Sequence, residues 1–395
     1  MRSLTFTVFQ TDEDMWARPS LLTSSVPLPS NASPINRIPR LLLTVGLGAL
    51  VGSQLSGILA DNSPWSIAGL LVGIFWGAQL QVLVHELGHA LAGRASGLRL
   101  IFMVAGKLAY EPGSGLNVGW SHPLTFGATG LVPTLEMTLP QIVRAMRTSV
   151  TAGPLVGLLF SGACWLGFLT APTVGWKSFL WATALVGIYL HVISLLFGVT
   201  RQGLVTDGGQ LLLLRPGAET AEARAAVPAL LARMEVQRPR DWPITLVEAA
   251  RRSQGEPSGE LGALQFTINY ALDTADLGGA ERLLEQARTL NTERPEARRS
   301  SFWAEETYLL ARQGYAKAAR EAFDAGVPDP NLSPVTRLRV QTAVLIAEGH
   351  PEEAMKTIEA ARIQLNAPGT VQALEMGFLN DLEGSVGERM RNVDR

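Results

Sequence analysis

The chain contains few cysteines and few charged residues, and each shortage excludes certain structures or partners. One cysteine among 395 residues excludes an internal disulfide. This residue, Cys164, lies in an apolar run without a basic neighbour in sequence, so we expect it to pack as a small hydrophobic residue. Charged residues make up 17% of the chain, and the net charge of −2 does not indicate a nucleic-acid partner. The first 40 residues lack a basic segment followed by an apolar stretch, so no secretory signal peptide is expected.

Hydrophobic residues, by contrast, make up 47% of the chain and concentrate in its first 215 positions. Four segments there are long and apolar enough to span a bilayer, namely residues 41–60, 65–92, 149–171 and 176–200. Short polar links join the first two and the last two, which predicts two antiparallel helix hairpins. The stretch 116–140, broken by glycine, proline and His122, predicts a re-entrant loop or a small sheet, and the strand-like segment 98–110 leads into it.

Composition divides the chain into three predicted parts. Residues 1–40 form a flexible N-terminal segment that is rich in proline and serine, and residues 41–215 form a membrane-embedded domain. Residues 216–395 are rich in glutamate, arginine and alanine and form a soluble domain. The predicted fold is mainly α: a polytopic bundle of about four membrane helices with a small strand or re-entrant segment, followed by a soluble α-helical repeat-like domain.

Basic residues gather at one end of the predicted spans. Arg37 and Arg40 precede the first span, five basic residues lie between the second and third, and Arg201 and Arg215 follow the fourth. The short links hold none, although Lys177 lies just inside the fourth span. The positive-inside rule therefore predicts that both termini face the cytoplasm. The scarcity of cysteine favours a bacterial inner membrane as the location of this integral membrane protein.

The chemically most informative motif is His85-Glu86-Leu87-Gly88-His89, inside the second predicted span. Two histidines four residues apart lie on one face of a helix and can bind one metal ion, while the adjacent glutamate can serve as a general base. A pair of histidines satisfied by packing is the alternative. Ionisable groups are costly within lipid unless they have a metal or partners, so the motif predicts a zinc site. That site would lie a turn or two below the cytoplasmic surface.

A hydrolytic zinc site usually has three protein ligands and an open position for water. Asp207, just after the fourth predicted span, is the best candidate for the third ligand. Taken alone, an Asp before Gly is better interpreted as a turn or helix-cap residue. Two other histidines remain open: His122 is a candidate for an oxyanion contact or a plain loop residue, and His191 for a group behind the ligands or for packing within its span.

Three motifs together resemble a known family. The segment His85-Glu86-Leu87-Gly88-His89-Ala90 lies in one span, Ala152-Gly153-Pro154-Leu155 opens the next, and Asp207-Gly208-Gly209 follows a third. In this order and spacing they resemble the site-2 protease family of intramembrane zinc metalloproteases, over roughly residues 40–215. The resemblance implies that His85, His89 and Asp207 bind Zn²⁺ and that Glu86 is the general base. It also implies cleavage of a membrane-embedded or membrane-proximal protein substrate.

The chain departs from the family pattern at two positions. The family often has Asn-Leu-Leu-Pro before the aspartate, where this chain has Ser194-Leu195-Leu196-Phe197. It also often has Asn three residues after the proline of the Gly-Pro motif, where this chain has Gly157. Both changes leave the predicted ligands and base intact, so they bear on substrate fit and catalytic efficiency. An edge strand within residues 100–110 is expected to hold an unwound substrate by β-addition.

The last 180 residues contain a weak repeat. Three similar segments align at Ala280, Ala319 and Ala354, spaced by 39 and 35 residues, near the 34-residue period of tetratricopeptide repeats. Each unit would be a pair of helices, and a stack of such pairs would present a surface for a protein partner. An ordinary helical bundle is the alternative.

Three functions compete at this point. The first is an intramembrane zinc metalloprotease whose cytoplasmic helical domain binds substrates or partners. The second is a catalytically idle, zinc-stabilised membrane scaffold that binds partners through its helical tail. The intact Glu86 argues against the scaffold, since a structural zinc site needs no base, whereas Ser194 and Gly157 argue mildly for it. A transporter would be expected to have more spans or an internal membrane repeat.

Overall fold

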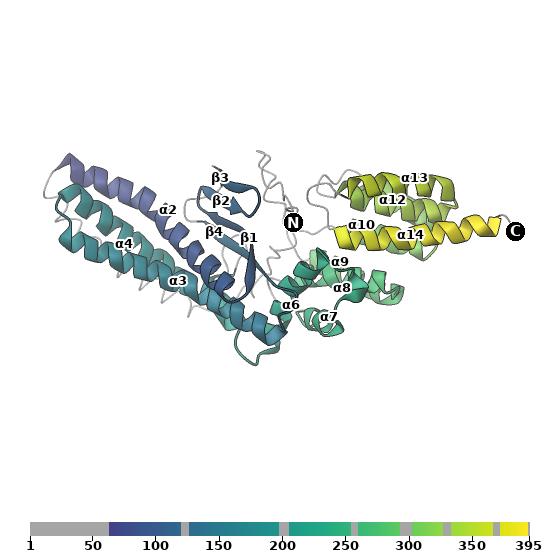
Figure 1. The fold of residues 1–395 in the computed structure, drawn as a ribbon, viewed down its shortest axis with the longest axis horizontal. Helices are drawn as coiled ribbons and strands as arrows, with labels where there is room; N and C mark the ends of the chain where they lie inside the picture. Colours follow the sequence, from purple (N-terminus) through teal and green to yellow (C-terminus); the bar gives the residue numbers. More distant parts are fainter. Residues whose placement is uncertain are drawn as a thin grey trace. The chain divides into compact units, whose positions relative to one another are not determined.

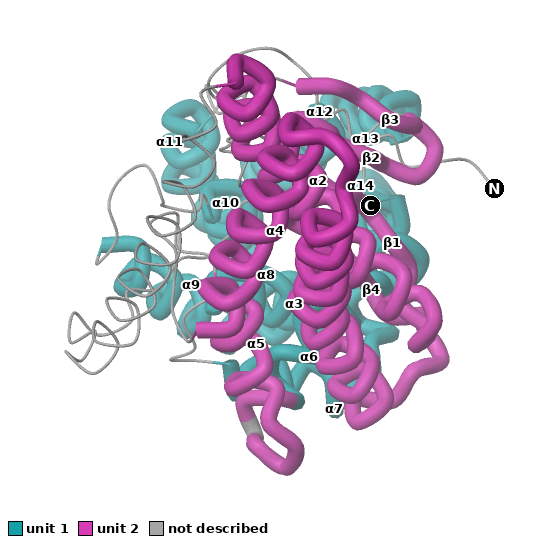
Figure 2. The backbone as a smooth tube through the Cα atoms, turned by 90° about the vertical axis from the view of Figure 1, so that its left-hand side faces the viewer, with its two compact units in different colours: residues 1–25, 222–395 teal, residues 26–221 magenta. Residues whose placement is uncertain are grey.

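The described part of the chain is mainly helical, with 13 α-helices and one small antiparallel sheet (Figure 1). In this computed structural model the described residues are 63–119, 126–196, 205–253, 260–292, 302–326, 333–365 and 372–393. They divide into two compact units, coloured separately in Figure 2, with the boundary between Ala221 and Glu222. Unit 2 contains the described residues up to 221, and unit 1 contains those from 222 onward.

Unit 2 is built on three long apolar helices that lie side by side (Figure 1). They are α2 (Pro64–Ala95), α3 (Leu139–Thr170) and α4 (Val174–Leu195), and each is long and apolar enough to cross a membrane. At 1.5 Å per residue, the 32 residues of α2 extend about 48 Å, well beyond the ~30 Å hydrocarbon layer. Three of the four predicted spans thus correspond to helices long and apolar enough to cross a membrane, while the predicted span 41–60 lies outside the described residues.

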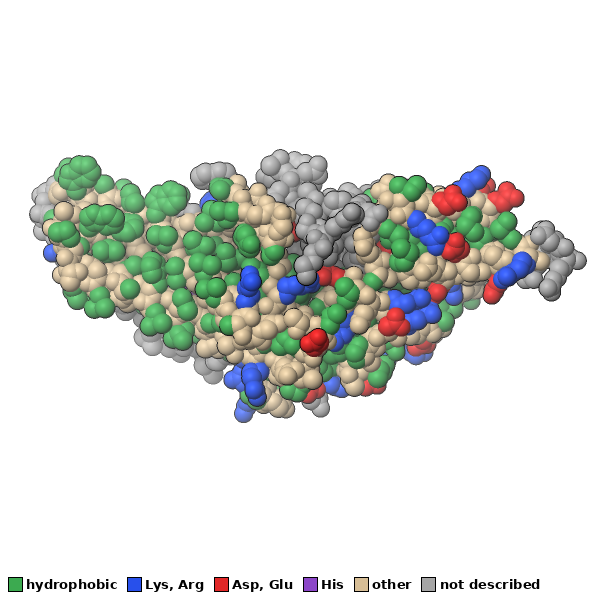
Figure 3. Space-filling view, viewed as in Figure 1, with side chains coloured by type: hydrophobic (Ala, Val, Ile, Leu, Met, Phe, Trp, Pro, Cys, Tyr) green, Lys and Arg blue, Asp and Glu red, His purple; other side chains and the backbone are tan. Residues whose placement is uncertain are grey.

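The surface of these helices is apolar, as expected for helices that face lipid. Large hydrophobic side chains on all three are exposed, among them Trp76, Leu159 and Trp176. Figure 3 shows hydrophobic side chains spread over this region, with few charges among them. In water so much exposed apolar surface would be unfavourable, so these three helices suit a membrane.

Small residues bring α2 and α4 close together. Gly69, Gly73 and Gly77 recur every four residues along α2, and a Cβ built on any of them would overlap an atom of Gly175, Phe179 or Thr183 on α4. Helices in membranes often associate through such seams, because backbone contact replaces the hydrophobic drive that lipid removes. Further into this contact, Trp181, Ala182 and Leu185 form a buried cluster.

The third predicted span begins earlier than its hydropathy indicates. The helix α3 starts at Leu139 rather than at residue 149, because Gln141 accepts a hydrogen bond from the backbone N–H of Thr138 and so caps its first turn. The added turns carry Arg144 and Arg147, which are too polar for a hydropathy window but suit a helix that extends into the polar interface.

A small sheet packs beside α2, and its strands run in the order β3-β2-β1-β4. The strands are β1 (Leu98–Ala105), β2 (Leu108–Glu111), β3 (Gly115–Val118) and β4 (Gly127–Pro133). Gln79 of α2 anchors the β1–β2 turn: its side chain donates to the carbonyl of Ala105 at 2.5 Å and accepts from the N–H of Lys107 at 3.0 Å. These bonds satisfy one backbone carbonyl and one backbone N–H of the turn.

The sheet decides between the two predictions for residues 116–140, and it moves the expected substrate edge. Strands form on both sides of the undescribed residues 120–125, which include His122. The expected edge within residues 100–110 is wrong over Met103–Ala105, because that stretch of β1 pairs with β2 and β4, and over Leu108–Tyr110, because β2 pairs with β1 and β3. Among the described strands, β4 lies at the edge next to β1.

A short helix, α5 (Asp207–Leu213), ends the site-bearing part of unit 2, and α6 (Glu219–Met234) crosses into unit 1. Unit 1 then continues with a 3₁₀ turn and eight α-helices. These are η3 (Pro239–Asp241), α7 (Ile244–Arg251), α8 (Glu260–Asp273), α9 (Leu277–Thr292), α10 (Trp303–Arg312), α11 (Ala316–Gly326), α12 (Pro334–Glu348), α13 (Pro351–Gln364) and α14 (Gln372–Val393).

Three successive helix pairs, α8–α9, α10–α11 and α12–α13, share one turn geometry. Each turn contains one residue in the left-handed region: Ala275 at φ 59°, Gly314 at φ 82° and Gly349 at φ 84°. In each turn the following N–H bonds to a carbonyl five residues earlier, as in a Schellman motif. Five residues after each left-handed residue comes one of the three aligned alanines, each 0% exposed. The weak sequence repeat therefore corresponds to a repeated helix pair.

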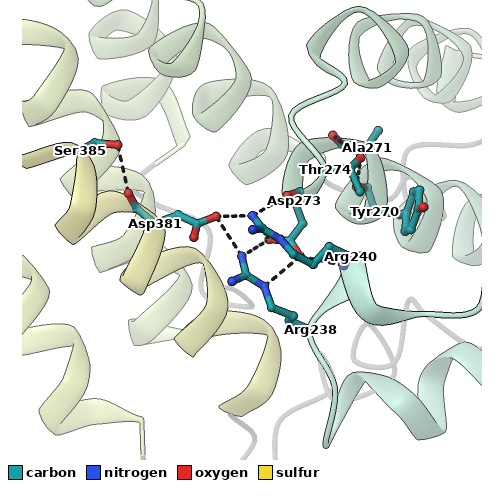
Figure 4. A network of polar contacts seen from close by, with 8 residues as sticks. All are labelled: Arg238, Arg240, Tyr270, Ala271, Asp273, Thr274, Asp381 and Ser385. Atoms are coloured by element: carbon teal, nitrogen blue, oxygen red, sulfur yellow. Dashed lines mark hydrogen bonds and ion pairs between the residues drawn. The ribbon is translucent and has the colours of Figure 1, made fainter. Parts of the chain in front are cut away.

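Ion pairs join the start of unit 1 to its last helix (Figure 4). The guanidinium groups of Arg238 and Arg240 both contact the fully buried carboxylate of Asp273 on α8 and the carboxylate of Asp381 on α14. The backbone N–H of Arg240 also donates to Asp273 at 2.8 Å. Because Asp273 is fully buried, losing either arginine would leave part of its negative charge unpaired, which is unfavourable. The network thereby joins η3, α8 and α14 to one another.

Candidate metal centre

The three predicted ligands meet where α2 and α5 approach each other. His85 and His89 lie in the last turns of α2, one helical turn apart, and Asp207 is the first residue of α5. The two Nε2 atoms are 3.0 Å apart, and the carboxylate oxygens of Asp207 lie 3.1 Å from that of His85 and 3.4 Å from that of His89. Ligand atoms around a tetrahedral zinc ion with ~2.0–2.1 Å bonds are roughly 3.3 Å apart, so this spacing fits a shared metal.

The orientation of the His89 ring is fixed from behind. Its Nδ1 lies 2.8 Å from the carbonyl oxygen of Ser149 on α3. A carbonyl can only accept, so Nδ1 carries the hydrogen, and in the neutral ring Nε2 then presents its lone pair to His85 and Asp207. Ligating histidines commonly bind a backbone carbonyl through their other nitrogen in this way.

Asp207 adds a negative charge to this group. Its carboxylate faces two ring nitrogens in a place where His85 and His89 are 9% and 8% exposed. Converging acceptor atoms need a cation or a proton between them, and His85, Glu86 and His89 form a buried group that can hold a metal ion.

Close approach of α3 explains the Gly-Pro motif. A Cβ on Gly153 would overlap the His89 ring, and a Cβ on Gly88 would come within 2.8 Å of the carbonyl oxygen of Ala152. Glycine at both positions lets α2 and α3 meet backbone to backbone beside the ligands. In the same way Gly208 lies against the carbonyl of Leu195, which brings the first turn of α5 onto the end of α4.

The carboxylate of Glu86 contacts the edge strand β4. This carboxylate accepts a 2.5 Å hydrogen bond from Oγ1 of Thr129, 43 residues further along the chain. A Cβ on Gly127, at the start of the same strand, would overlap that carboxylate. Thr129 and Gly127 were missed in the sequence, because nothing local marks a threonine or glycine that reaches a glutamate through tertiary packing.

The other residues that the sequence singled out have different surroundings. His191 lies on α4 directly behind His85, with the two Nδ1 atoms 3.0 Å apart. Ser194 donates to the carbonyl of His191 on its own helix at 2.9 Å. Gly157 packs against the His191 ring. His122 lies outside the described residues.

Comparison with known proteins does not identify this chain. No protein-family model, no curated protein and no solved structure matches this chain. Its function is therefore inferred from its own residues, namely three membrane-length helices and a buried His85-Glu86-His89 group that can hold a metal ion.

Proposed function

We propose that this protein is an intramembrane zinc metalloprotease of the site-2 protease type, which hydrolyses peptide bonds of membrane-embedded or membrane-proximal protein substrates. One observation carries the proposal. Three potential ligand atoms, from His85, His89 and Asp207, converge at 3.0–3.4 Å inside a membrane-length bundle, with an additional carboxylate from Glu86 beside them. A structural zinc site would not need the fourth group, whereas hydrolysis does.

The donor set fits zinc by its chemistry, since two imidazoles and one carboxylate leave a fourth position open. Bound there, zinc would supply a water of lowered pKa and polarise the scissile carbonyl. Glu86 would accept the proton of the attacking water and deliver it to the leaving amine, which is the role of a general base and then a general acid. Thr129 occupies one carboxylate oxygen of Glu86 and so leaves the other for this proton.

The position of β4 supports a way of holding the substrate. A membrane helix must unwind locally before its peptide bonds become accessible, and an extended segment can then pair with an open strand edge. Among the described strands β4 has such an edge, and its Thr129 contacts Glu86 directly. A segment added to β4 would thus run beside the general base, in place of the edge first expected in residues 100–110.

Side chains at the two ends of the bundle support the proposed depth of the site in the membrane and the side of the membrane that it faces. Trp65, 75% exposed, and Trp176, 58% exposed, start α2 and α4 and suit a membrane interface. His85 lies 20 residues after Trp65, so it is about 30 Å along the helix, close to the opposite interface. Arg94 lies in the last turn of α2, and Arg144 lies in the first turns of α3. We infer that this end faces the cytoplasm of a bacterial cell.

Unit 1 would then also be cytoplasmic and soluble. Its repeated helix pairs are the kind of structure that binds protein segments, so we assign it to substrate or partner binding. The catalytically idle scaffold remains the competing function, and loss of the base distinguishes the two.

The deciding experiment compares membrane proteomes of cells that carry the wild-type protein, Glu86→Gln or the matched control Glu136→Gln. Glu136 is an exposed carboxylate in the loop before α3. If the proposal holds, one or a few single-span proteins accumulate uncut with Glu86→Gln and remain cleaved with Glu136→Gln. Identical proteomes, together with a phenotype on deleting unit 1, would instead establish the scaffold.

A further inference from the structure

A chain of polar side chains lies behind His85, in the part of the bundle where α2, α3 and α4 all meet. The planes of the His85 and His191 rings are only 7° apart, with ring centroids 5.1 Å apart, and their Nδ1 atoms are 3.0 Å from each other. The Nε2 atom of His191 lies 3.0 Å from Oε1 of Gln81, one turn before His85 on α2. His191 and Gln81 are 1% and 0% exposed.

The direction of every hydrogen in this chain can be deduced from its far end. The Nε2 amide of Gln81 donates to the carbonyl of Thr183 at 3.0 Å, so Oε1 is the atom that faces His191. An amide oxygen only accepts, and the Nε2 of His191 therefore carries that ring's hydrogen. In the neutral ring its Nδ1 is then an acceptor, and the hydrogen between the two rings belongs to Nδ1 of His85. The Nε2 of His85 is left with a free lone pair that points at Asp207.

Two glycines make room for this arrangement. A Cβ on Gly157 of α3 would overlap the His191 ring, and a Cβ on Gly187 of α4 would overlap the side chains of Gln81 and Ser161. Ser161 also contributes, since its hydroxyl lies 3.2 Å from Oε1 of Gln81. Packing alone would not need this space: an apolar side chain at position 191 and alanines at the glycines would fill the bundle without burying polar groups.

We propose that His191 is a positioning residue, which holds His85 in the tautomer that presents Nε2 to the metal. This inference rests on the proposed metalloprotease function and deepens it. It gives a reason for Gly157, which stands where the site-2 protease pattern often has Asn: a larger residue there would displace the ring that orients a ligand. Loss of such a partner typically weakens metal affinity about 10–100-fold, without removing any ligand.

Zinc affinity of the full-length protein in detergent, measured by competition with a chromophoric chelator, tests this role. His191→Leu keeps the volume but removes the acceptor, and we expect zinc to bind roughly 10–100-fold more weakly. His191→Asn places an oxygen where Nδ1 was, and we expect affinity to stay within a few-fold of wild type. Wild-type affinity in His191→Leu, or an equal loss in both variants, would overturn the role of His191.

A second pair of variants, on α3, tests the position of the His191 ring. Gly157→Ala should weaken zinc binding, whereas Gly162→Ala, on the same helix with open space around the added Cβ, should not. In a His191→Ala background the room is restored, so Gly157→Ala should have no further effect there. An equal loss in both backgrounds would mean that Gly157 acts independently of His191.

The same titration separates this inference from the proposed function. Wild-type protein that binds one zinc, lost in His85→Ala and His89→Ala, together with unchanged affinity in His191→Leu, would remove only the positioning role. Wild-type protein that binds no zinc would overturn the metal centre, and the role of His191 with it.

Discussion

His89 and Ser149 are joined by two reciprocal hydrogen bonds between α2 and α3. The ring Nδ1 of His89 donates to the carbonyl oxygen of Ser149 at 2.8 Å, and the hydroxyl of Ser149 donates to the carbonyl oxygen of His89 at 2.9 Å. The first bond sets the tautomer of a proposed ligand, and the second satisfies a backbone carbonyl of the helix that carries it. The two hydrogen bonds between these residues thus have different roles, and point mutations can remove one bond without the other.

Gly153→Ala should disturb the first of these bonds without touching a ligand. The added methyl group would overlap the His89 ring, so the ring must turn away from Ser149 and from the metal position. We expect zinc affinity in the chelator competition to fall at least about tenfold. Ser149→Ala is the matched control, since it removes only the hydroxyl and keeps the carbonyl; its affinity should be nearly that of wild type. If Ser149→Ala lost zinc as strongly, the carbonyl would not be the orienting group.

Thr129→Val should affect catalysis and leave the metal in place. Valine has the shape of threonine but cannot donate to the Glu86 carboxylate, so the base loses the contact that aims it. Because poor placement of a general base costs part of its 10²–10⁴-fold contribution, we expect kcat to fall about tenfold with zinc affinity unchanged. Thr129→Ser keeps the hydroxyl and should retain most activity. Equal loss in both variants would point to packing of β4 rather than to the hydrogen bond.

The sequence predicts well those features that are encoded locally. Hydropathy over some 20 residues finds α2, α3 and α4, and the four-residue spacing of His85 and His89 puts both on one helix face. Helix ends were less accurate, because the capped start of α3 and its arginines carry no apolar signal.

Contacts between distant segments could not be predicted. Thr129, Gly127 and Gln81 reach their partners only after folding, and none has a distinctive neighbour in sequence. The strand-like character of residues 98–110 was visible, but which strand lies at the edge depends on pairing order, and β4 took that position. For His191 the sequence left two interpretations open, since its partner His85 is 106 residues away.

Glu305→Gln should stabilise unit 1 at neutral pH and above. Glu305 is buried on α10, and burial raises the pKa of its carboxyl above the ordinary 4.5, although Arg339 and a hydrogen bond from Gln265 work in the opposite direction. Between pH 4.5 and the raised pKa the folded state keeps a proton that the unfolded state releases, so stability falls as pH rises through this window. Glutamine carries no charge and avoids that loss.

Thermal unfolding of the full-length protein in detergent, followed at several pH values, checks this prediction. The variant should match wild type near pH 4 and unfold at a higher temperature than wild type at pH 8. The exposed Glu352 on α13 provides the control, since Glu352→Gln should change little at either pH. A variant that is less stable than wild type at pH 8 would mean that the charge of Glu305 is needed by Arg339.

Ala275→Gly should stabilise the first helix pair of unit 1. Ala275 is the one described non-glycine residue with a positive φ, at 59°, and it occupies the turn position that Gly314 and Gly349 hold in the next two pairs. A side chain in the left-handed region costs roughly 1–2 kcal/mol, which glycine avoids. Glycine also gives the unfolded chain more freedom, which offsets part of this gain, so we expect a net stabilisation of about 1 kcal/mol.

The reverse changes supply the matched test. Gly314→Ala and Gly349→Ala introduce the same strain at φ 82° and 84°, where an added Cβ would meet no atom within 4 Å, so backbone conformation alone should cost about 1 kcal/mol in each. Hydrogen exchange of the amides around each turn reports the local free energy of opening. Protection should rise in Ala275→Gly and fall in the two alanine variants. If Ala275→Gly instead lost protection, packing of the Ala275 methyl group would outweigh the strain, and the three turns would be alike in backbone geometry but not in the energy that holds them.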